Sequence, residues 1–189
     1  QSRFGNGEDG NLFKGQASDD ASGPGSDFGS DMTWLGWDPE PYHDKYQLKT
    51  NEAEDDYSQL IEFIDALNNS TVENRPDQLG AVLDIDSSIR SLALNMLYTN
   101  LDSYNGSAHN YYLYDRDDTG QFTHLMWDTN EAYGNFRMGM TPDQAIEMSP
   151  YWLPSGSNSD RPFMSNIWEV DEWNRDYLRV LARMLRETF

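Results

Sequence analysis

Apolar residues recur every three or four positions in three stretches of the chain, which is the spacing of an amphipathic helix. The predicted helices cover about Asp56–Leu67, Asp86–Thr99 and Asp171–Thr188. The middle stretch has apolar residues on most sides, so we expect it to be the central, largely buried helix. Shorter helical segments are predicted over about Pro76–Leu83, where proline occupies the first turn, and over Phe163–Trp168.

Two shorter stretches, Tyr111–Asp115 and Phe122–Trp127, predict the strands of a β-hairpin. Asp117–Gly120 between them is a turn signal, because glycine adopts positive φ without strain. A further short strand is predicted near Asn11–Lys14. The expected fold class is therefore α+β, mainly α, with one small β-hairpin.

Turn and capping signals mark the boundaries of these segments. Asp86 or Ser87 is expected to cap the central helix, because short polar side chains accept hydrogen bonds from the first free amides of a helix. Residues 16–31 are rich in glycine, serine and aspartate, so we expect a flexible loop there. A second loop is expected over Pro150–Pro162.

Length, charge and cysteine content limit the class of protein. The 189 residues correspond to one domain or a large piece of one. The formal net charge of −20 repels nucleic acid and anionic lipid and favours bound divalent cations. The absence of cysteine excludes disulfides, thiolate zinc sites and cysteine nucleophiles. No stretch approaches the ~18 apolar residues of a membrane-spanning helix, so no membrane insertion is expected.

Three residues with side-chain oxygens border the predicted hairpin: Asp102 precedes it, Asn110 opens its first strand and Asp128 ends its second. Because a hairpin returns the chain to its starting point, we expect these side chains to lie close together. Helix, loop aspartate, two strands and a second aspartate is also the order of parts in the catalytic half of a protein kinase. There the first aspartate handles the acceptor hydroxyl, and the other two side chains bind magnesium. The alternative, that each is only a turn or capping residue, stays open.

Neighbouring residues have competing interpretations. His109 can act as a base or make a structural hydrogen bond. Trp127 can form the floor of a base-binding cleft by stacking, or it can be a core aromatic. Asp115–Gly120 resembles the start of a calcium-binding loop, but Met126 stands where that loop needs a bidentate glutamate. An EF-hand is therefore rejected.

Several blocks of the sequence together resemble the spore coat protein H (CotH) kinase family. These blocks are Gly10–Gly15, Tyr46–Glu52, Leu60–Asn68, Asn100–Tyr104, His109–Tyr114 and Trp127–Asp128. Each block alone is a weak signal, but the combination is specific and covers most of the chain.

The resemblance implies an atypical, secreted or spore-coat-associated protein kinase that transfers the ATP γ-phosphoryl group to serine or threonine hydroxyls. Under it, Asp102 is the catalytic aspartate, Asn110 and Asp128 are metal ligands, and Trp127 contacts the adenine. The implied cofactors are ATP and Mg²⁺, with Mn²⁺ as an alternative metal. The implied partner is a protein substrate, such as a coat or surface protein, outside the cell or in the spore coat. The implied fold is the C-terminal lobe of a kinase-like domain, with the hairpin carrying the metal site.

Two departures from the family pattern affect these expectations. Asn130 stands where the family commonly has a second acidic residue, which weakens any metal role at that position. The family's smaller nucleotide-binding lobe, with its phosphate-anchoring lysine, would lie before Gln1. We therefore expect residues 1–189 to be a partial domain that is inactive on its own. The alternative function is a non-catalytic spore-coat or cell-surface interaction protein that retains the fold.

Overall fold

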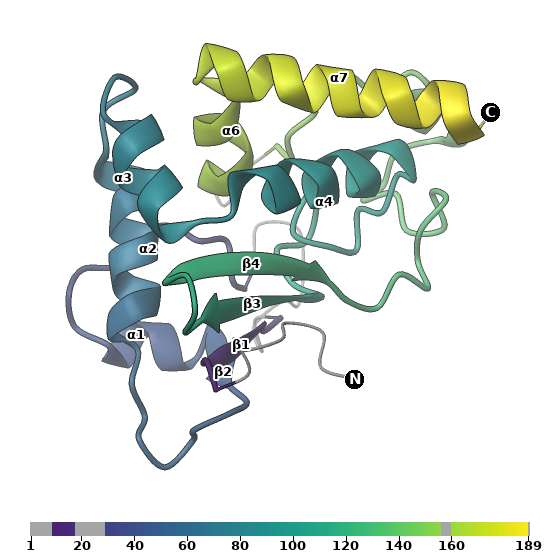
Figure 1. Ribbon diagram of the computed structural model, residues 1–189. Coiled ribbons are helices and arrows are strands. Elements are labelled where there is room, and N and C mark those ends of the chain that lie inside the picture. The colour runs from purple at the N-terminus through teal and green to yellow at the C-terminus, as the bar shows by residue number, and fades with distance from the viewer. Residues whose placement is uncertain (1–8, 18–28, 156–159, 189) are drawn as a thin grey trace.

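The computed structural model describes residues 9–17, 29–155 and 160–188 (Figure 1). Within these ranges, four short strands form one antiparallel sheet in the order β2-β1-β3-β4. The strands are β1 (Leu12–Gly15), β2 (Tyr46–Leu48), β3 (Tyr111–Arg116) and β4 (Gln121–Met126). The fold class is α+β, as predicted. The hairpin of β3 and β4, however, is half of a larger sheet and not an isolated unit.

The first strand joins segments that are far apart in the sequence. Phe13 of β1 lies opposite Leu48 of β2 on one side and opposite Leu113 of β3 on the other. The sequence pattern does not predict β2, because three residues are too few to show a period of two. The strand forms because Tyr46 and Leu48 are buried while the residue between them is exposed, so one face packs on the core.

Seven helices are present in the described residues. They are α1 (Glu40–His43), α2 (Ser58–Asn69), α3 (Arg75–Val82), α4 (Ile85–Leu97), α5 (Pro142–Ile146), α6 (Pro162–Trp168) and α7 (Asp171–Thr188). The helices predicted from apolar spacing are confirmed, whereas α1 is too short to show that spacing. None of the described helices is both long and apolar enough to cross a lipid bilayer.

The start of α4 differs from the prediction, because its cap is Asp84 and not Asp86 or Ser87. Asp84 Oδ1 accepts a hydrogen bond from the Ser87 amide at 3.1 Å. The amide of Asp84 donates to the backbone oxygen of Phe122 in β4 at 2.9 Å. This contact with the sheet keeps Asp84 extended and sets the residue at which α4 begins.

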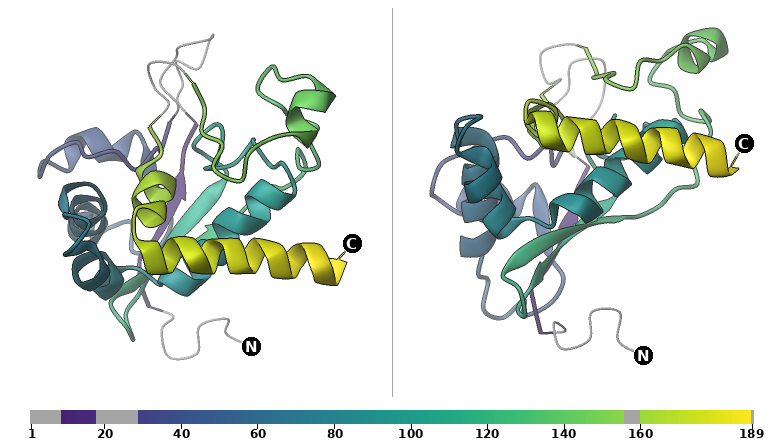
Figure 2. Two further views of the ribbon diagram at one scale, coloured as in Figure 1. Left: turned by 90° about the horizontal axis from the view of Figure 1, so that it is seen from above. Right: turned by 45° about the horizontal axis from the view of Figure 1, so that its top comes forward.

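The elements are arranged in layers. Figure 1 shows α4 lying across the sheet and α7 covering α4 on the side away from the sheet. Helices α2 and α3 stack beside one end of the sheet, and α5 stands apart from the other helices (Figure 2). Phe122 of β4 joins these layers, because its ring centroid lies 6.2 Å from that of Phe13 and 5.2 Å from that of Phe63 in α2. The core therefore fixes the sheet against the helices.

Candidate active site

The predicted site residues lie where α4 ends, β3 begins and β4 ends, on the right-hand side of Figure 1. Asp102 and Asn110 belong to the loop that links α4 to β3, and Asp128 follows β4 almost directly. Because β3 and β4 are antiparallel, the start of β3 lies beside the end of β4, and the loop that carries Asp102 and Asn110 connects α4 to the start of β3. The hairpin thus returns the chain to the loop, as expected from the sequence.

Side chains fix the loop to α4. The Asn100 amide donates to the backbone oxygen of Asn95 at 2.8 Å, and Asn100 Nδ2 donates to Asn95 Oδ1 at 2.9 Å. Further along the loop, Asn105 Nδ2 donates to the backbone oxygen of Leu92 at 3.2 Å. All three asparagines are buried, so these bonds form away from water and breaking them leaves polar groups unsatisfied.

Bonds within the loop fold it back on itself. The Ser107 amide donates to the backbone oxygen of Leu101, and the Ala108 amide donates to that of Ser103, both at 3.0 Å. Gly106 lies so close to Leu101 that an added Cβ atom would be 2.1 Å from its backbone oxygen. Only glycine fits at this position without a backbone shift. The loop therefore has one compact shape.

The carboxylate of Asp102 is held from three directions. Ser107 Oγ donates to Asp102 Oδ1 at 3.2 Å, and His109 Nε2 lies 3.4 Å from the same oxygen. Asn110 Nδ2 donates to Asp102 Oδ2 at 3.0 Å. The Asp102 side chain remains 22% exposed, so its carboxylate is fixed but still open to a substrate.

Asn110 is oriented by the same contact. Its Nδ2 also donates to the backbone oxygen of Asp102 at 2.8 Å, and its backbone is in the left-handed region at φ 56°. Because both of these bonds use the amide nitrogen, the amide oxygen is left for another partner. No donor to that oxygen occurs among the described residues.

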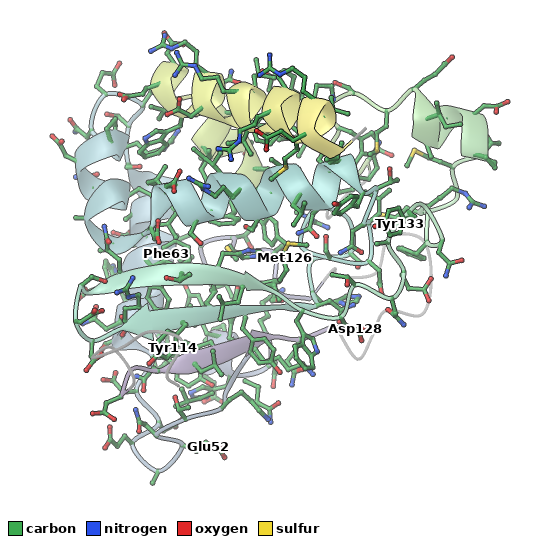
Figure 3. The ribbon with its side chains drawn as sticks, turned by 45° about the vertical axis from the view of Figure 1, so that its right-hand side comes forward. Glu52, Phe63, Tyr114, Met126, Asp128 and Tyr133 are labelled. Atoms are coloured by element: carbon green, nitrogen blue, oxygen red, sulfur yellow. The ribbon has the colours of Figure 1, made fainter. Side chains whose placement is uncertain are left out.

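Asp128 is placed by the residues on either side of it. The Trp127 amide donates to the backbone oxygen of Asn110 at 3.2 Å, and the Tyr133 amide donates to that of Tyr98 at 2.6 Å. Figure 3 shows Asp128 beyond the end of β4, on the same side of the molecule as Tyr133. Its side chain is exposed, and no described residue forms an ion pair with it. The bond from Trp127 to Asn110 therefore places the backbone of Asp128 one residue beyond a contact with the β3 side of the loop.

The side chains of Asp102, Asn110 and Asp128 are oxygen donors, which decides the class of metal ion that they could bind. No cluster of three or more histidine, cysteine, aspartate and glutamate side chains able to hold a metal occurs in the described part of the chain. Magnesium usually keeps several waters and takes one or two carboxylates together with substrate phosphates. The Asn110 amide oxygen and the Asp128 carboxylate are hard oxygen donors of the type that magnesium binds.

Comparison with known proteins identifies the family. The family model described as CotH kinase protein matches residues 1–189. The chain belongs to the CotH kinase family. Inner spore coat protein H from Bacillus subtilis (strain 168) is 28% identical to it over 146 residues. The match covers 76% of this chain but only 36% of that relative, so the chain spans about a third of the relative's length.

Two further site predictions can be placed in this CotH-family fold. His109 lies in the loop before β3, with its Nε2 atom 3.4 Å from Asp102 Oδ1. Trp127 is 52% exposed, which rules out the interpretation as a core aromatic. Its ring meets that of Tyr112 edge to face at 5.4 Å, and its remaining surface is open beside Asp128.

The sequence does not predict two residues that hold the loop between α4 and β3. Ser30 donates to the backbone oxygen of Ala108 through both its amide, at 3.0 Å, and its Oγ, at 2.7 Å. Arg161 donates to the backbone oxygens of Tyr104, at 3.0 Å, and Gly106. Ser30 lies near the end of the predicted flexible loop but is buried; residues 18–28 of that loop lie outside the described residues. The only sequence signal near Arg161 is the proline after it, which marks a helix start.

Proposed function

We propose that this CotH-family domain takes part in transferring the γ-phosphoryl group of ATP to a serine or threonine hydroxyl of a protein substrate. One observation carries the proposal: Asn110 Nδ2 donates to both the backbone oxygen and Oδ2 of Asp102. This joins a candidate base to a candidate metal ligand whose oxygen points elsewhere. The aspartate and asparagine of a kinase catalytic loop have the same two roles.

The proposed reaction uses Asp102 at the acceptor. The acceptor hydroxyl oxygen forms a bond to the γ-phosphorus, and the bond from that phosphorus to the β–γ bridging oxygen breaks, which releases ADP. Asp102 orients the hydroxyl and takes its proton late in the transfer. The contacts from Ser107, His109 and Asn110 keep the carboxylate in one orientation, which is the requirement for positioning a nucleophile.

Asn110 Oδ1 and the Asp128 carboxylate are the proposed ligands for Mg²⁺, with Mn²⁺ as the alternative metal. When bound, the metal ion neutralises the phosphate charge that develops during transfer. This matters in a chain of net charge −20, which repels an unaccompanied triphosphate. The exposed ring of Trp127 is proposed to contact the adenine, because it lies next to Asp128.

Phosphate transfer from labelled ATP by the intact protein tests the proposal. We expect Asp102→Asn to reduce the transfer rate by about 10²–10⁴-fold, which is the usual contribution of a positioned general base. Asp86→Asn is the matched control, because Asp86 is an exposed aspartate near the start of α4 that forms an ion pair with Arg90. Equal labelling by the Asp102 variant and the wild-type protein would remove Asp102 from the mechanism.

The second candidate function is a structural or interaction role without turnover. It is favoured by the name of the Bacillus subtilis relative, which is an inner spore coat protein. We propose the same location, the spore coat or cell surface, for either function. No labelling by the wild-type protein with either Mg²⁺ or Mn²⁺ would favour the structural role.

A further inference from the structure

Arg161 is a buried cation that contacts the loop carrying Asp102 and Asn110. Its side chain is only 1% exposed, and it stands at the residue before α6. Its Nε donates to the backbone oxygen of Tyr104 at 3.0 Å, and one terminal nitrogen donates to that of Gly106. Along the sequence, Tyr104 and Gly106 lie between the candidate base, Asp102, and the candidate metal ligand, Asn110.

The helix that follows Arg161, α6, is itself fixed to the core. The Phe163 amide donates to the hydroxyl of Tyr104 at 3.0 Å. Asn166 Nδ2 donates to the backbone oxygen of Leu67, the buried end of α2, at 2.8 Å. The side chain of Arg161 therefore extends to the loop from the start of a helix that is bonded to Tyr104 and to α2.

We propose that Arg161 is a positioning residue for phosphoryl transfer, which holds Asp102 and Asn110 in their relative geometry by fixing the backbone oxygens of Tyr104 and Gly106. The inference rests on the proposed function. A planar guanidinium can donate to two oxygens two residues apart, whereas a lysine ammonium is a single point of charge at the end of a flexible chain.

Burial of the Arg161 charge has a desolvation cost that its hydrogen bonds to the loop offset. Removing a charged group from water is unfavourable, whereas replacing Arg161 by an apolar side chain leaves the backbone oxygens of Tyr104 and Gly106 without these donors. Burial lowers the pKa of the Arg161 guanidinium from its ordinary value, although arginine stays charged in proteins. The guanidinium donates two hydrogen bonds that fix the orientation of the backbone oxygens of Tyr104 and Gly106. An apolar side chain cannot form these bonds.

Arg75 provides a matched control. It is also buried, and it donates to the backbone oxygens of Ser70, at 3.0 Å, and Asn166, at 3.1 Å. These oxygens lie at the end of α2 and in α6, outside the 102–110 loop. Arg75 also forms an ion pair with Glu169 at 2.7 Å. Replacing Arg75 therefore removes a buried arginine, this ion pair and one bond to α6, but none of the bonds to the backbone oxygens of Tyr104 and Gly106.

The experiment compares Arg161→Met, Arg161→Lys and Arg75→Met in the intact protein, below the unfolding temperature of every variant. We expect Arg161→Met to lower kcat for phosphate transfer by about 10²-fold, because a displacement of about 1 Å can have an effect of that size. The KM for ATP should change by less than about threefold, and Arg161→Lys should recover part of kcat. Arg75→Met should lower the unfolding temperature while kcat stays near the wild-type value.

Three outcomes would overturn the inference, and they are distinguishable. A kcat for Arg161→Met equal to that of Arg75→Met would reduce Arg161 to a structural residue, with the proposed function unaffected. No transfer by the wild-type protein would remove the proposed function and the positioning role together. If Arg161→Met does not fold, Arg161→Lys decides, and an unchanged kcat in that variant contradicts the need for two fixed oxygens.

Discussion

Both carboxylate oxygens of Asp102 contact residues of the loop. The acceptor positions that remain on each oxygen decide which of them can accept a further hydrogen bond. An ionised carboxylate offers about four lone-pair sites. Ser107 and His109 contact Oδ1, whereas Asn110 donates to Oδ2. The less occupied oxygen, Oδ2, is therefore the better acceptor for a substrate hydroxyl. Under the proposed function, the loop therefore holds the carboxylate through both oxygens, while Oδ2 retains an acceptor position for the substrate.

Gly106→Ala should disrupt this arrangement without touching a polar side chain. The added Cβ would lie 2.1 Å from the backbone oxygen of Leu101, so the loop must shift. We expect a lower unfolding temperature and a loss of phosphate transfer, measured by thermal denaturation and labelled ATP. Gly80→Ala is the control, because Gly80 lies in α3 with no atom within 4 Å of the added Cβ. That variant should be stabilised by about 0.5–1 kcal/mol; equal behaviour of the two would contradict the compact loop.

At the scale of elements, α4 connects the sheet to the loop that carries Asp102 and Asn110. It begins where Asp84 donates to Phe122 of β4, and it ends where Asn95 holds Asn100. Because both ends of this 13-residue helix are bonded, a shift of α4 on the sheet would also shift the loop. The placement of Asp102 therefore depends on how α4 is seated on β4.

Replacing the cap of α4 tests this boundary. Asp84→Ala removes the bond to the Ser87 amide and should lower the free energy of unfolding by about 1 kcal/mol, measured by urea denaturation. Asp86→Ala removes only an exposed ion pair with Arg90 and should change it by less than about 0.5 kcal/mol. The reverse order of effects would place the cap at Asp86, as the sequence alone suggests.

The sequence predicts those elements whose signal is local. The apolar spacing of α4 and α7 and the turn between β3 and β4 are each contained in fewer than about twenty residues, so the pattern is visible without the fold. The grouping of Asp102, Asn110 and Asp128 could be predicted because it needs only the hairpin, which the structure contains. The bonds from Ser30 and Arg161 to the loop span 78 and 55 residues, and no local period reports such distant contacts. The pairing of β1 with β3 is missed for the same reason.

At the scale of the whole molecule, the core contains polar rings as well as aliphatic side chains. Tyr104 and Tyr111 are buried, and their hydroxyls donate to the backbone oxygens of Asp31, at 2.9 Å, and Ser30, at 2.5 Å. Burial raises the pKa of both phenols, so both remain neutral donors. The ring of His124 stacks on that of Tyr111 at 5.1 Å. The stability of the fold thus depends on a titratable group in its interior.

His124→Gln should make the stability of the protein less sensitive to acid. Burial lowers the pKa of His124 from 6.5 to about 3 in the folded state. Between these pH values the unfolded chain binds a proton that the folded chain does not. The contribution of neutral His124 is therefore complete above pH 6.5 and is lost as the pH falls toward 3, by up to about 1.4 kcal/mol per pH unit.

Urea denaturation at pH 7, 6 and 5 measures this difference. The variant should be less stable at pH 7, because it loses the ring stacking on Tyr111 and alters the 2.8 Å bond between His124 Nδ1 and Ser91 Oγ. Its free energy of unfolding should nevertheless fall less steeply with acid than that of the wild-type protein. The carboxylates titrate in both proteins, so the difference between the two curves isolates the buried imidazole. Parallel curves would show that His124 becomes protonated inside the folded protein, which would contradict its burial as a neutral ring.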